Sequence, residues 1–158
     1  LTEYAAEKAT ATYHEGSVWT YTGNYDIALP CATQNEINGE AAKRLVAQGV
    51  RCVSEGANMP SNLDAIAVYK EHNLLYGPAK AANAGGVAVS ALEMSQNSLR
   101  LSWTREEVDS RLQNIMTNIF NTAKTTAENY DLGNDYLAGA NIAAFENIAN
   151  AMIAQGIV

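Results

Sequence analysis

The sequence lacks both of the glycine-rich loops that commonly hold nucleotide phosphates. Neither GxGxxG nor GxxxxGK(S/T) occurs among its 158 residues. Such loops hold phosphates on backbone N–H groups at the start of a helix. Without one, we expect this chain by itself to bind a nucleotide weakly or not at all.

Basic residues are also scarce. The chain carries 10 Lys and Arg against 17 Asp and Glu, a net charge of −7, and has no run of basic residues. Nucleic acids and anionic membrane surfaces are recognised through clustered Lys and Arg. No apolar run reaches the roughly 18 residues that a membrane span needs. We therefore expect neither nucleic acid nor a membrane as a partner.

Histidine and cysteine are too few to build a zinc site. The chain has only His14, His72, Cys31 and Cys52, with no CxxC pair. No paired general acid and base stands out either, so we expect no metal site and no catalytic residue in this chain. Both cysteines lie in apolar runs predicted as strands, which favours buried, reduced thiols and a cytoplasmic protein.

Strand and helix patterns alternate through the first half. Strands are predicted at 25–30, 50–54 and 74–76, with weaker candidates at 11–13 and 18–21. Helices are predicted over the stretches between and before them: 1–9, 39–48, and 61–71 with Ser61 as cap. Strand, helix and strand in this order, with short connections, predict an α/β fold with a parallel sheet.

The second half carries helix patterns only. Helices are predicted over 83–101, from Thr104, where Glu107 completes a capping box, and over 135–155. The middle helix has an apolar stripe from Val108 to Ala123, which we interpret as core packing. The sequence thus predicts half of a sheet followed by a helical C-terminal tail.

Three turns rich in small and polar residues follow the predicted strands. They contain Thr33, Asn58 and Asn83. Ligands of parallel α/β sheets bind at the carboxyl ends of the strands, so these side chains are expected to converge on one crevice. Each also has a local alternative, because Thr33 and Asn83 could simply cap helices and Asn58 could form an ordinary turn.

Two further polar residues, Lys80 and Ser90, leave alternatives open. Lys80 could extend into water or contact a ligand or another element. Ser90, inside a predicted helix, could bond a carbonyl of its own helix or donate to a ligand carboxylate.

Read in order, these turns resemble the hexameric glutamate dehydrogenase family. The resemblance is carried by residues 26–36 (DIALPCATQNE), 55–60 (EGANMP) and 80–90 (KAANAGGVAVS). It continues through 92–98 (LEMSQNS), 101–103 (LSW), 139–143 (GANIA) and 151–156 (AMIAQG). It covers nearly the whole chain from residue 26.

The resemblance implies reversible oxidative deamination of L-glutamate to 2-oxoglutarate and ammonium, with NADP or NAD as cofactor. NADP is favoured because many relatives with this pattern use it, and the assembly implied is a homohexamer. The family's catalytic Lys and Asp lie in an N-terminal substrate domain, and its GxGxxG turn also precedes the part matched here. Leu1 begins within a helix pattern, so we expect this chain to be the cut end of a longer protein and inactive by itself.

The resemblance also implies a domain assignment. Residues 1–80 would be part of a Rossmann-like dinucleotide-binding region. Residues 81–158 would be a helical region that completes this domain and packs toward the substrate domain.

Four residues are implied to contact the cofactor. Ala32 and Thr33 would lie on its nicotinamide side, Asn58 near the nicotinamide ribose, and Asn83 beside the nicotinamide and the substrate.

Two residues, Val87 and Ser90, are implied to form part of the glutamate pocket, with Ser90 donating to the distal carboxylate. Two other interpretations stay open: a non-enzymatic α/β binding or assembly module, and an unrelated α/β enzyme with a small-molecule site at the same edge of the sheet.

Overall fold

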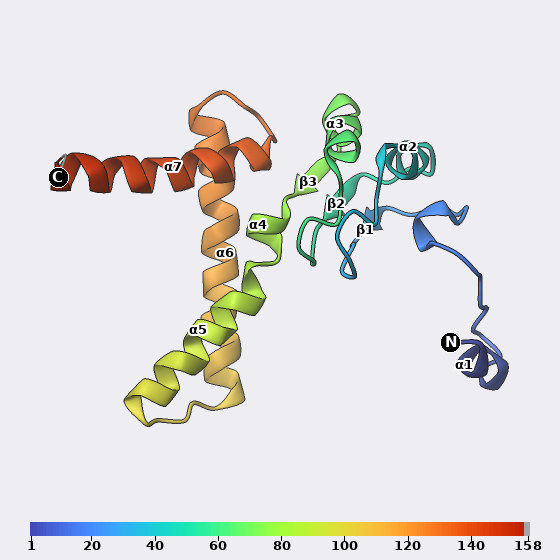
Figure 1. The fold of residues 1–158 in the computed structure, drawn as a ribbon, viewed down its shortest axis with the longest axis horizontal. Coiled ribbons are helices and arrows are strands. Elements are labelled where there is room, and N and C mark those ends of the chain that lie inside the picture. Colours follow the sequence, from blue (N-terminus) through green and yellow to red (C-terminus); the bar gives the residue numbers. More distant parts are fainter. Residues whose placement is uncertain (157–158) are drawn as a thin grey trace.

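A computed structural model describes residues 1–156 (Figure 1). Its elements, in chain order, are α1 (Thr2–Glu7), the 3-10 turn η1 (Val18–Thr20), β1 (Ile27–Ala28), α2 (Gly39–Ala47), β2 (Cys52–Ser54), α3 (Leu63–Glu71), β3 (Leu75–Gly77), α4 (Ala79–Ala82), α5 (Ala84–Leu99), α6 (Arg105–Asn129) and α7 (Tyr136–Gln155). None of the helices in this range is long and apolar enough to span a bilayer.

The three strands form a parallel sheet in the order β1-β2-β3, which confirms the predicted α/β fold with a helical C-terminal part. The register pairs Ala28 with Val53 and Val53 with Tyr76. Side chains alternate between the two faces of a sheet, so these three share one face, and all three are buried.

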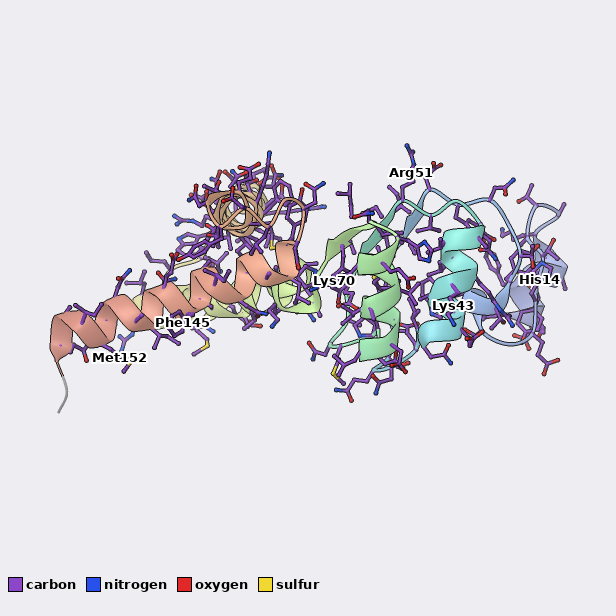
Figure 2. The ribbon with its side chains drawn as sticks, turned by 90° about the horizontal axis from the view of Figure 1, so that it is seen from above. His14, Lys43, Arg51, Lys70, Phe145 and Met152 are labelled. Carbon is purple, nitrogen blue, oxygen red and sulfur yellow. The ribbon has the colours of Figure 1, made fainter. Side chains whose placement is uncertain are left out.

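Helices α2 and α3 cover that face, side by side (Figure 2). Leu45 of α2 and Val68 and Tyr69 of α3 join the buried strand residues in one core. The opposite face is left largely open, with Ile27 59% and Leu75 42% exposed. The sheet is therefore half of a layered α/β core, closed on one side only.

The C-terminal half is a helical assembly around α6. Helix α5 runs beside one end of α6, and α7 crosses the other end (Figure 1). Gly139 permits the crossing, because a Cβ there would collide with the carbonyl oxygen of Ala123 and lie 3.0 Å from the Cβ of Ala127. The predicted capping box at Thr104 is present. Of the apolar stripe predicted as core, Ala123 is buried, Phe120 is 51% exposed and the rest are partly buried.

Two strand predictions near the N-terminus were wrong. Residues 11–13 form no regular element. Residues 18–20 form η1, because the Ser17 side chain accepts a hydrogen bond from the Trp19 N–H, a local bond that favours a turn.

The predicted cap of α3 was also wrong by one residue. Asn62 caps the helix by accepting from the Ala65 N–H at 2.9 Å. Ser61 instead forms an isolated parallel bridge with Ile37, and its hydroxyl lies 3.1 Å from that of Tyr69. Ser61 thus belongs to the sheet edge and the core.

Candidate functional site

The three turns that follow the strands surround one open cavity of about 640 Å³ at the carboxyl edge of the sheet. It is lined by Ala32 from the first turn, Asn58 from the second, Asn83 from the third, and Val87 from the start of α5. The structure therefore brings together four of the six predicted ligand residues, while Thr33 and Ser90 do not line this cavity. Its size falls in the range of small-molecule sites.

Asn58 and Asn83 meet across the cavity. Asn83 Nδ2 donates to Asn58 Oδ1 at 2.7 Å. This bond leaves a donor on Asn58 Nδ2 and an acceptor on Asn83 Oδ1, the two kinds of group that an amide or a sugar hydroxyl requires. Asn83 also occupies the position before α5 without making a side-chain cap, so the local alternative for it is not observed.

Close contacts hold the first two turns together. The Gly56 N–H donates to the Pro30 carbonyl at 2.9 Å, and a Cβ on Gly56 would lie 2.5 Å from the Cys31 sulfur. Asn35, at a positive φ of 54°, donates its N–H to the Met59 carbonyl at 3.0 Å. With the Cys31 side chain in this position, any Cβ at position 56 would collide with it, so glycine allows the two turns to approach.

The backbone at Ala32 and Thr33 is held from within the chain. Both N–H groups donate to Glu36 Oε1, at 3.0 and 3.2 Å, and Trp19 Nε1 donates to Glu36 Oε2 at 2.8 Å. The cap of α2 is Asn38 rather than Thr33, so the exposed Thr33 side chain has no capping role.

Ser90 forms the local bond that was one of its two alternatives. Its hydroxyl donates to the Gly86 carbonyl at 3.3 Å, and the residue is exposed. Val87, one turn earlier, is 71% exposed. Lys80 contacts another helix, since its Nζ donates to Asn141 Oδ1 of α7 at 2.6 Å.

The prediction that both cysteines are buried in strands was wrong for Cys31. The strand ends at Ala28, so Cys31 lies in the following turn, where it is exposed and lines the cavity. Cys52 lies in β2 and is partly buried, and this burial raises the pKa of its thiol. Within residues 1–156, no three His, Cys, Asp or Glu side chains are grouped to hold a metal ion.

A role for Glu55, a buried charged residue that holds these turns, was not predicted from the sequence. Glu55 is 2% exposed and accepts hydrogen bonds from Ser61 N–H at 3.1 Å, Tyr76 OH at 2.7 Å and Ala79 N–H at 2.8 Å. Burial and the hydrogen bond to Glu55 raise the pKa of the Tyr76 hydroxyl. An acidic residue directly after a buried strand was the signal that could have found it.

A second cavity, of about 350 Å³, lies between the open face of the sheet and α6. Its lining includes Leu75, Met116, Ile119 and Phe120 and is mostly apolar. Such a lining suits packing by another apolar segment better than a charged ligand.

The comparisons with known proteins agree with this geometry. Residues 1–156 match the model of the family described as Glutamate/Leucine/Phenylalanine/Valine dehydrogenase. The NADP-specific glutamate dehydrogenase of Giardia intestinalis is 50% identical over 160 residues, covering 100% of this chain and 36% of the relative. The glutamate dehydrogenase of Bacteroides thetaiotaomicron is 52% identical over 158 residues, covering 100% of this chain and 35% of the relative.

A solved structure shares the fold. The crystal structure of Plasmodium falciparum glutamate dehydrogenase superposes with a TM-score of 0.91 at 46% identity, covering 99% of this chain and 34% of that one. This chain thus spans about a third of the length of the relatives that it matches.

Proposed function

Because this chain belongs to the Glutamate/Leucine/Phenylalanine/Valine dehydrogenase family, we propose that it is part of a glutamate dehydrogenase and holds the reacting end of the cofactor beside the substrate. The reaction is the reversible oxidative deamination of L-glutamate to 2-oxoglutarate and ammonium, with hydride transfer to NAD(P)+. The glutamate dehydrogenase names of relatives about half identical to this chain support this choice.

The observation that carries the proposal is the cavity where Ala32, Asn58 and Asn83 meet. The bonded asparagine pair offers one amide donor and one carbonyl acceptor. These groups fit the carboxamide and ribose hydroxyls of a nicotinamide riboside. Thr33, exposed beside Ala32, would contact the same end of the cofactor.

These residues provide no comparable binding site for the phosphates of the cofactor. The chain contains no GxGxxG turn, so a different segment of the enzyme would hold the pyrophosphate. We propose that residues 1–80 are the nicotinamide-facing part of a Rossmann-like domain, with residues 81–158 completing it. Catalytic Lys and Asp residues would come from a separate substrate domain.

The chain's own contribution to catalysis is positioning. NAD(P), when bound, supplies the hydride chemistry. Asn58 and Asn83 would orient the nicotinamide, and orientation of two reacting groups can contribute several kcal/mol, on the order of 7 or more, to lowering a barrier. Closing a substrate domain over this edge would exclude water.

Val87 and Ser90 form the proposed wall of the glutamate pocket. Val87 lines the cavity and Ser90 lies one turn further along α5. The Ser90 hydroxyl would leave the Gly86 carbonyl, which it bonds at 3.3 Å, and donate to the distal carboxylate of glutamate. A hydrogen bond to a charged group is stronger than one to a neutral carbonyl, which favours this exchange.

The remaining assignments concern the whole enzyme. We propose NADP as the cofactor, in line with the NADP-specific names of several relatives. We propose a cytoplasmic homohexamer. Exposed apolar side chains of α7, such as Phe145 and Met152 (Figure 2), are 68% and 63% exposed and would be covered in such an assembly.

The test is a kinetic assay of the full-length protein that contains this chain. NADPH oxidation should require 2-oxoglutarate and ammonium together, and NADH should be used less efficiently. The keto acids of leucine, phenylalanine and valine serve as controls for the other substrates named in the family description. A protein that binds NADPH but oxidises it with none of these substrates would favour a binding or assembly module instead.

A further inference from the structure

We propose that Glu55 is a positioning residue that fixes the two asparagines of the site relative to each other. The inference rests on the proposed function, since it assigns Glu55 a role in placing the nicotinamide. Glu55 does not line the cavity, so it acts through the turns that it holds.

The Glu55 carboxylate joins the ends of two neighbouring strands. Its Oε2 atom accepts from Tyr76 OH of β3 at 2.7 Å and from the Ala79 N–H, the first residue of α4, at 2.8 Å. Its Oε1 atom accepts from the Ser61 N–H at 3.1 Å. The carboxylate thus closes its own turn, residues 55–61, and fastens it to the turn that follows β3.

Both asparagines are placed by these bonds through the backbone that surrounds them. Asn58 lies within the closed turn, three residues after Glu55. Asn83 is bonded to the same anchor, because its N–H donates at 2.9 Å to the carbonyl of Ala79, whose own N–H binds Glu55. A shift of the carboxylate would therefore move Asn58 and Asn83 apart and disturb their 2.7 Å bond.

A carboxylate is a costly side chain to bury at this position. Glu55 is 2% exposed, and none of the ion pairs formed by residues 1–156 includes it. Burying a carboxylate without a cation costs free energy that its three donors must offset. In return, the carboxylate accepts hydrogen bonds from three donors in different segments, at the edge of the sheet where the cavity lies.

The experiment compares three variants of the full-length enzyme. Glu55→Gln keeps the shape but turns an N–H2 group toward at least one of the three donors. Tyr76→Phe removes one donor to Glu55. Tyr69→Phe is the matched control: Tyr69 is equally a buried tyrosine, its ring lies 5.4 Å from that of Tyr76, and its hydroxyl bonds Ser61 Oγ rather than Glu55.

The readouts are kcat per folded subunit, the KM values for NADP+ and glutamate, and the deuterium isotope effect on kcat with glutamate deuterated at Cα. We expect Glu55→Gln to lower kcat about 10- to 100-fold and to raise the isotope effect, because misplacement slows hydride transfer itself. Tyr76→Phe should show a smaller change in the same direction. Tyr69→Phe should change thermal stability alone.

The inference is overturned if Glu55→Gln and Tyr76→Phe change only the folded fraction or the melting temperature. It is equally overturned if Tyr69→Phe matches Tyr76→Phe in kcat and isotope effect. Should Glu55→Gln fail to fold, the tyrosine pair decides by itself. A wild-type enzyme without glutamate dehydrogenase activity overturns the proposed function, and the inference with it.

Discussion

Replacing Gly139 by alanine should weaken the crossing of α6 and α7. The added methyl group would collide with the Ala123 carbonyl and lie 3.0 Å from the Ala127 Cβ, both within the buried part of α6. Relieving the collision requires the helix axes to separate, and overpacking of this kind costs about 1–3 kcal/mol. The better helix propensity of alanine offsets about 1 kcal/mol, so a net loss of up to about 2 kcal/mol is expected.

Gly86→Ala is the matched control. Gly86 lies in α5, and a Cβ there meets no atom within 4 Å. The same substitution should therefore stabilise the protein by up to about 1 kcal/mol through propensity alone. Thermal unfolding of the full-length protein measures both variants, and the two substitutions should shift the melting temperature in opposite directions. Equal shifts of one sign in the two variants would refute the packing argument.

Ser90→Ala in the full-length enzyme should raise the KM for glutamate far more than that for NADP+, and an unchanged glutamate KM would remove Ser90 from the pocket. Cys31, exposed in the cavity, should react with a thiol reagent before Cys52, whose pKa is raised by burial. Saturating NADPH should protect Cys31 from the reagent. Labelling of Cys31 at the same rate with and without NADPH would place the cofactor elsewhere. Burial, partly opposed by its hydrogen bond to Ser61, raises the pKa of Tyr69 from 10.0 to about 12. Unfolded tyrosine ionises first, so the free energy of unfolding should fall as pH rises through 10 to 12, and less steeply in Tyr69→Phe; identical slopes would contradict this.

The sheet and the helices could be predicted because their signals are local. The apolar runs at β2 and β3, the stop at Gly49 and the capping box at Thr104 each depend on neighbouring residues, and each predicted its element. A general rule of parallel sheets predicted that Thr33, Asn58 and Asn83 converge. Asn58 and Asn83 do so, in a 2.7 Å bond, whereas Thr33 does not line the cavity.

The sequence-based predictions failed where a side chain could make either a local contact or a contact with a distant part of the chain. Ser61 has the sequence features of a cap, but the bridge to Ile37 and the contact with Tyr69 place it in the core, and Asn62 takes the cap. The role of Glu55 depends on donors 6, 21 and 24 residues away. No local pattern encodes such a set, because it exists only once β2 and β3 are paired.

We propose above all that the cavity of Asn58 and Asn83 holds the nicotinamide end of NADPH. Steady-state kinetics of Asn83→Ala in the full-length enzyme tests this most directly, with the exposed Asn121→Ala on α6 as control. Loss of the acceptor on Asn83 should raise the KM for NADPH or lower kcat, so that kcat/KM falls about tenfold or more. This is the effect of losing one hydrogen bond of about 1.4 kcal/mol. The control should keep the wild-type kcat/KM. An Asn83→Ala enzyme with wild-type kcat and KM for NADPH would contradict the claim.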